Sequence, residues 1–167
     1  MTQIHIRYEL PRTPVFTGQA VAVVRDEMLR GMREALVLSD GELVKRTPVG
    51  VTGRMRSGWI QRVSILSAEP VRIHGENVNV TPYAIHVDQG SVPHWPPYGP
   101  GSSLALWVQR KLGPNVSAFL VARRISRVGT RAQRIVERTA RAVRGPITNH
   151  FQTTVINRIV RRLGGRG

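Results

Sequence analysis

The chain begins with an alternating pattern of polar and apolar residues and then changes to a helical spacing. Residues 3–10 alternate strictly, which predicts a half-buried β-strand. From about residue 17 to Leu38, apolar residues recur every three or four positions. These positions are Val21, Val24, Met28, Met32 and Ala35. Because this spacing places them on one face of a helix, we expect one long helix here, followed by a short helical piece over residues 41–46.

A second group of extended segments follows the long helix. Residues 59–66 alternate in a way that leaves neither face purely polar, as expected for a strand with one side partly covered by a neighbour. Residues 71–74 and 77–80 predict a hairpin that turns at Gly75 and Glu76. Together these elements predict an α+β fold, with an antiparallel sheet packed by the long N-terminal helix.

The C-terminal half is predicted to be helical after a loop. Residues 92–103 contain four prolines and two glycines, a composition that excludes regular helix or strand. Helical spacing then covers residues 103–112, 116–128, 131–144 and 147–163. Glycine and proline at 129, 145 and 146 predict breaks between the last three helices.

The charge of the chain is strongly positive and unevenly distributed. The formal net charge is +15, and residues 121–167 contain twelve arginines against one acidic residue, Glu137. We therefore expect a single domain over 1–167, with an α+β core at 1–120 and a basic helical extension at 121–167. Such an imbalance favours a polyanionic or acidic protein partner, although an Arg-rich solvated helix face would have the same composition.

Candidate catalytic residues are few. His86, Asp88 and His94 are close enough in sequence to be considered as metal ligands, but a proline-rich loop separates His94 from the other two. The serines have no nucleophile-elbow context, and no glycine-rich loop carries a phosphate-binding lysine. We therefore expect no enzyme activity, no catalytic residue, no metal and no cofactor. The absence of cysteine excludes disulfides.

Two turn motifs carry most of the information about function. The first is Thr47–Trp59 (TPVGVTGRMRSGW), and the second is Pro82–Gly90 (PYAIHVDQG). Pro48 ends the preceding helix and Gly53 allows the chain to reverse, while Gly90 ends the second motif. The residues that we expect to shape these turns are Thr47, Pro48, Gly53, Arg54, Trp59, Tyr83 and Gly90.

The order of these motifs resembles the small neck or tail-completion proteins of long-tailed bacteriophages, which include minor tail and head–tail joining proteins. The resemblance covers roughly residues 17 to 163. It implies a homo-oligomeric ring, for which we expect six subunits, between the capsid connector or stopper and the tail terminator or tail tube. It also implies a place in the virion neck after assembly in the host cytoplasm. A tail terminator is an alternative within the same class.

Two groups of residues are candidates for contacts in such a ring. Trp95, Pro96, Pro97 and Tyr98 form a possible contact arm, because aromatic residues anchor interfaces and prolines reduce the entropy lost on docking; a locally folded surface loop is the alternative. The second group is a basic stripe that requires a helix continuous through Gly129. Its members are Arg127, Arg131, Arg134, Arg138 and Arg141. The stripe is expected to face the DNA channel, an acidic partner or solvent.

A free-standing nucleic-acid-binding protein is the alternative from another functional class. It would use the same arginines and bind with a steep salt dependence. The sequence contains no helix-turn-helix, zinc knuckle or aromatic RNA-binding sheet motif. Aromatic residues make up 5% of the chain, which is low for a protein that stacks bases.

Overall fold

The computed structural model describes residues 3–9, 18–68 and 70–164. The elements occur in the order β1 (Gln3–Glu9), α1 (Gly18–Arg46), α2 (Arg54–Ser57), β2 (Trp59–Ser67), β3 (Arg72–Asn79), α3 (Ala84–Gln89), α4 (Ser103–Lys111), α5 (Ala118–Val128), α6 (Ile135–Asn149), the π-helical segment η1 (His150–Val155) and α7 (Ile156–Gly164). They form two compact units. Of the described residues, 3–9, 18–46, 59–68, 70–78 and 136–164 belong to one, called the sheet unit below; residues 47–58 and 79–135 belong to the other, the hairpin unit.

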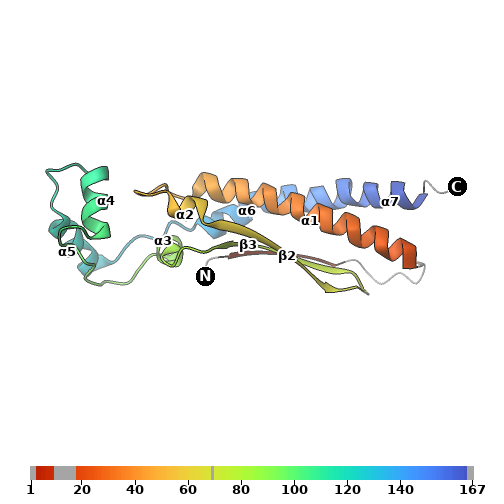
Figure 1. Ribbon diagram of the computed structural model, residues 1–167, viewed down its shortest axis with the longest axis horizontal. Helices are drawn as coiled ribbons and strands as arrows, with labels where there is room; N and C mark the ends of the chain where they lie inside the picture. Colours follow the sequence, from red (N-terminus) through yellow and green to blue (C-terminus); the bar gives the residue numbers. More distant parts are fainter. Residues whose placement is uncertain (1–2, 10–17, 69, 165–167) are drawn as a thin grey trace. The chain divides into compact units, whose positions relative to one another are not determined.

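The sheet unit is an α+β structure, as the sequence predicted. Its three antiparallel strands are in the order β1-β3-β2, and α1 lies against β2, η1 and α7 (Figure 1). The core lies between α1, the sheet and the C-terminal helices. Its buried members include Met28, Met32, Ile73, Val143, Phe151 and Val155. The predicted face of α1 is therefore the face that packs, and burial of this apolar area supplies the main stabilising free energy.

The prediction of a hairpin at Gly75 and Glu76 is wrong. Both residues lie in the middle of β3, which pairs with β1 along its length. A Cβ atom at Gly75 would lie 2.5 Å from the Sδ atom of Met32. The glycine therefore allows close approach of the strand to α1, which is the other common reason for glycine in a strand. The chain instead reverses between the end of β2 at Ser67 and the start of β3 at Arg72.

The long helix also continues further than expected. It does not stop near Leu38 but runs as one element to Arg46. Gly41 is exposed and a Cβ atom there would contact nothing, so this glycine reduces helix propensity without breaking the helix. Leu43 is fully buried beyond it, and this burial favours continuation of the helix.

The C-terminal helix is continuous where a break was predicted. α6, η1 and α7 together form a 30-residue helix, and Pro146 lies inside it. Proline removes the hydrogen bond to the carbonyl group four residues earlier, here that of Ala142. Both residues are exposed, so water can satisfy that carbonyl group. On the opposite side Val143 and Ile147 are buried in the core, and their packing holds the helix together.

The π-helical segment also has a reason in the sequence. The buried positions from Val143 to Ile159 recur strictly every four residues. In an α-helix each such step overshoots a full turn by about 40°, so a straight helix would rotate these side chains off the core. The wider turns of a π-helix rotate the chain back. The segment η1, at residues 150–155, lies in the middle of this series.

Ion pairs join α1 to the C-terminal helix. The Arg158 guanidinium donates to both oxygens of Glu34, at 3.0 and 2.8 Å, and Arg162 donates to buried Glu27 at 2.9 Å. His150 Nε2 lies 3.1 Å from Glu34. Burial alone would raise the pKa of Glu34, but Arg158, with smaller contributions from His150 and Arg30, holds that pKa below its usual value of 4.5. Glu34 therefore stabilises the helix pair in its ionised form.

The hairpin unit contains the second turn motif and all of the first except Trp59, which is the first residue of β2 in the sheet unit. Gly50 and Gly53 have positive φ angles of 63° and 70° in the first motif, where the Gly53 N–H bonds to the Val49 carbonyl group. Asn79 is the last residue of β3 and lies three positions before the second motif. Its side chain donates to the Met55 carbonyl group at 2.8 Å. Residues 47–58 of the first motif and the second motif therefore act as structural turns in one unit.

Candidate interaction surface

Residues 91–130 form an excursion from the hairpin unit that is closed at its base. Ser91 and Thr130 pair as an isolated antiparallel bridge, with N···O distances of 3.2 and 3.1 Å. Gly129 makes this closure possible, since its φ is +70° and a Cβ atom there would lie 1.9 Å from the Ser91 carbonyl oxygen. The two ends of the segment 91–130 are therefore held together by the Ser91–Thr130 bridge.

Two short helices form the far part of this excursion. The Ser102 hydroxyl caps α4 by accepting a hydrogen bond from the Ala105 N–H at 3.1 Å. Gly113, with φ of +96°, follows the end of α4, and α5 then packs against α4 (Figure 1). The predictions of helices at 103–112 and 116–128, and of an irregular loop before them, are confirmed.

Three aromatic rings meet on the helix pair formed by α4 and α5, which we call the helical hairpin. Trp95 and Tyr98 from the loop contact Phe119 from α5, with ring-centroid distances of 6.1 Å (Trp95–Tyr98), 6.1 Å (Trp95–Phe119) and 5.6 Å (Tyr98–Phe119). These side chains nevertheless remain 57%, 43% and 43% exposed. We call these three residues the aromatic cluster. Aromatic rings that pack on each other but stay exposed to this degree form a surface suited to a partner.

The aromatic cluster lines an open pocket of about 590 Å³ together with residues of α5. The other lining residues are Arg123, Ser126 and Arg127. Because the three residues follow Phe119 at helical spacing, they lie on the same face of α5. The pocket therefore combines an apolar floor with two guanidinium groups, which suits a partner that carries both apolar or aromatic groups and negative charge.

The structure brings together part of the predicted contact arm and adds residues that the sequence analysis missed. Trp95 and Tyr98 belong to the cluster, while Pro96 is half-buried and Pro97 exposed between them. Phe119 and Ser126 were not identified as contact residues, and Arg123 was considered only as one of the arginines that could contact DNA. Their common helical face was visible in the sequence, but its relation to the loop required the tertiary fold.

The predicted basic stripe is not formed, because α5 ends at Val128 and α6 begins only at Ile135. Arg127 lies on α5, whereas Arg131 and Arg134 lie in the irregular connection, where Arg134 has a positive φ of 49°. Arg138 and Arg141 lie on α6 in the other unit, and Arg141 pairs with Glu137. Thr130, in the same connection, forms the bridge with Ser91. The five arginines therefore do not share one helical face.

The residues of the turn motifs have structural positions. Thr47 and Trp59 are buried, and Pro48 follows the end of α1. Gly53 precedes α2, whose first residue Arg54 is exposed. Tyr83 precedes α3 and is partly exposed, and Gly90 ends α3 with φ of +80°. Gly90 also lies so close to Thr130 that a Cβ atom would be 2.5 Å from its carbonyl oxygen.

His86, Asp88 and His94 do not form a metal-binding group. Asp88 is buried in α3 and its carbonyl group accepts the Arg134 N–H, while the exposed His94 bonds through Nδ1 to the Val92 carbonyl group at 2.9 Å. Within the described residues, the group with metal-ligand spacing is His5, His74 and Glu76. None of these three was singled out from the sequence.

Comparisons with protein-family models, with curated proteins and with solved structures gave no match. In the part of the chain that the structure describes, no helix has both the length and the apolar character needed to span a membrane.

Proposed function

We propose that this chain is a structural subunit of the neck or tail-completion ring of a long-tailed bacteriophage. In this role it joins the capsid connector to the tail tube, surrounds the DNA channel and performs no catalysis. The observation that carries the proposal is the exposed aromatic cluster at the pocket with Arg123 and Arg127. The resemblance of the two turn motifs to phage neck and tail-completion proteins is the reason for proposing this class of protein.

The exposed apolar surface of the helical hairpin supports assembly as the mechanism. Besides the aromatic cluster, several large apolar side chains of residues 92–128 are exposed. They include Val92, Leu106, Trp107, Leu112, Leu120 and Val128. Burial of such side chains contributes about 25 cal/mol per Å² of apolar area. A subunit that covers this surface with a neighbour is therefore stabilised by assembly.

The sheet provides a second means of contact between subunits. β1 and β2 are its edges, and each edge strand presents backbone N–H and C=O groups on one side to a further strand. Ile65 and Leu66 on β2 are also exposed. A ring can therefore close through strand addition as well as through the helical hairpin.

The test is the mass of the purified chain by light scattering, alone and with connector and tail-tube partners. We expect a discrete multimer, or a monomer that forms a ring with its partner. Trp95→Ala and Phe119→Ala should reduce assembly, whereas the matched change Trp107→Ala, at an exposed ring outside the pocket lining, should reduce it less. Assembly that Trp95→Ala and Phe119→Ala leave unchanged would exclude the aromatic cluster as the contact, whatever the effect of Trp107→Ala.

A free-standing nucleic-acid-binding protein is the second candidate, and the same pocket is the observation in its favour. Aromatic residues are scarce in the whole chain, yet three of them are concentrated beside Arg123 and Arg127. Base stacking on rings and phosphate contacts by arginine are the two components of single-strand binding. A monomer that binds single-stranded DNA tightly at low salt, releases it at high salt and loses binding in Trp95→Ala would favour this candidate over the ring.

A further inference from the structure

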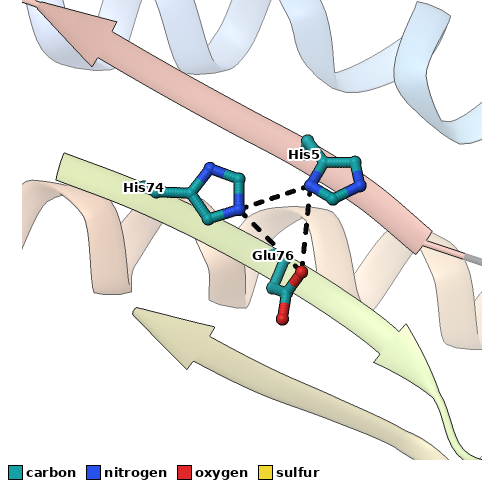
Figure 2. Close-up of side chains that lie close together, drawn as sticks. All are labelled: His5, His74 and Glu76. Atoms are coloured by element: carbon teal, nitrogen blue, oxygen red, sulfur yellow. Dashed lines mark hydrogen bonds and ion pairs between the residues drawn. The ribbon is translucent and has the colours of Figure 1, made fainter. Parts of the chain in front are cut away.

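A group of two histidines and one glutamate lies on the face of the sheet opposite α1. The β1–β3 register places His5 directly across from Glu76, and His74 precedes Glu76 by two residues on the same strand. Alternate residues of a strand share a face, and Gly75 between them faces α1. All three side chains therefore project from the outer face and point toward one another (Figure 2).

The distances between the donor atoms suit one small cation. His5 Nδ1 lies 3.3 Å from His74 Nε2, and Glu76 Oε2 lies 3.8 and 3.9 Å from these two nitrogens. A point equidistant from the three atoms is about 2.1 Å from each, which matches Zn–N and Zn–O bond lengths in proteins. This point lies in the plane of the three atoms, whereas a tetrahedral ion with bonds of about 2.1 Å needs donor atoms about 3.4 Å apart. Rotation of the Glu76 side chain that moves Oε2 about half an ångström toward the histidines supplies that geometry without backbone movement.

The donor types select the class of metal. Two imidazole nitrogens and one carboxylate oxygen suit Zn²⁺ and related divalent transition metals, whereas Ca²⁺ and Mg²⁺ require mainly oxygen ligands. Three protein ligands leave a fourth position for water or a partner side chain. His74 and Glu76 have only 21% and 18% of their side chains exposed, while His5 has 48% exposed. The two ligands on β3 are thus mostly buried, and the site is accessible to solvent on the side of His5.

The surroundings of the group orient the carboxylate. Arg62 on β2 lies 3.6 Å from Glu76 Oε1, so it engages the oxygen that does not face the histidines. A charged partner on the free oxygen of a ligating carboxylate is typical of protein metal sites. The packing of Gly75 on Met32 fixes the backbone between the two β3 ligands.

We propose that His5, His74 and Glu76 bind one divalent transition-metal ion of the zinc class. The ion links β1 to β3 and thereby fastens the edge strand of the sheet. This inference is independent of the proposed function, because it rests on the outer face of the sheet and not on the aromatic cluster.

The test is titration of the untagged full chain with ZnCl₂ by calorimetry, with Co²⁺ absorption as a spectroscopic probe. We expect one ion per chain, the visible absorption of tetrahedral Co²⁺ and a rise in melting temperature on addition of Zn²⁺. Glu76→Gln and His74→Ala should each weaken binding at least about tenfold. His94→Ala, which removes an exposed histidine from the hairpin unit, is the matched control and should leave binding unchanged.

Three results would overturn the proposal. They are no binding by the wild-type chain, equal weakening by His94→Ala, and full affinity in Glu76→Gln. Each would mean that the histidines and the glutamate form an ordinary cross-strand polar group. Glu76→Gln has nearly the same shape as the wild-type residue, and its circular dichroism without metal shows whether the sheet is intact.

Discussion

The contact between α1 and η1 at Gly31 gives a sharp prediction about stability. A Cβ atom at Gly31 would lie 2.4 Å from Val155 Cγ2 and 3.4 Å from both Val155 Cγ1 and Phe151 Cε1. Val155 cannot turn away, because both of its methyl groups face the glycine and a β-branched side chain in a helix has essentially one rotamer. For Gly31→Ala, the two carbons must therefore separate by about 1 Å to reach ordinary contact, which requires backbone movement.

The size of the effect follows from a matched substitution in the same helix. Gly41→Ala has open space around the new Cβ atom and should stabilise the chain by about 1 kcal/mol through helix propensity. Gly31→Ala gains the same propensity but adds overpacking, which costs about 1–3 kcal/mol. We therefore expect Gly31→Ala to be about 1–3 kcal/mol less stable than Gly41→Ala, since the propensity term cancels in the comparison.

Guanidinium unfolding monitored by circular dichroism measures this difference. A third variant identifies its cause, because in a Val155→Ala background the clash is removed and Gly31→Ala should no longer be less stable than Gly41→Ala. The double-mutant coupling should then be about 1–3 kcal/mol. If Gly31→Ala is as stable as Gly41→Ala, or if Val155→Ala gives no rescue, the two helices do not approach each other as described.

Three further predictions concern the C-terminal helix, the ion pairs and the base of the hairpin. Pro146→Ala should raise the free energy of unfolding by about 2–3 kcal/mol; no change in a denaturant titration would mean that the helix is interrupted there. Glu34 has a lowered pKa, so its contribution is present above about pH 4.5 and is lost as the pH falls below that value. The difference in stability between wild type and Glu34→Gln should shrink over this range, and a pH-independent difference would contradict the role of ionised Glu34. Gly129→Ala should expose residues 91–130 to proteolysis more than Gly113→Ala, because both glycines have positive φ but only Gly129 contacts the Ser91 carbonyl group; equal cleavage would refute the closed base.

The fold class and most elements could be predicted because the corresponding patterns are local. The strand over residues 3–9 and the face of α1 follow from local alternation and helical spacing, and the structure confirms both. Leu10, the last residue of the predicted alternation, lies outside the described residues. The errors occurred at glycine and proline positions, where packing of the surrounding element overrides the local signal. Gly75 permits contact with Met32, and Pro146 is held in a helix by the packing of its opposite side. Neither contact can be seen without the partner element.

The candidate surface was predictable only in part for the same reason. Trp95 and Tyr98 stand out in a proline-rich loop, so the sequence identified them. Phe119 could not be identified in this way, because only its contact with Trp95 and Tyr98 of the loop distinguishes it from other apolar residues of the predicted helix. The metal-binding group joins His5 to residues about seventy positions later, and only the strand register brings these residues together.

The antiparallel pairing of α1 with the C-terminal helix also sets the order of events during synthesis. The Glu27–Arg162 pair spans 135 residues and the Glu34–Arg158 pair spans 124. The apolar face of α1 therefore leaves the ribosome early but cannot be covered until Phe151, Val155 and Ile159 have followed it. During this interval the nascent chain exposes a long apolar stripe, and closure of such distant contacts is slow. Folding of the sheet unit is thus a late step, because its core cannot close before the C-terminal helix has been made.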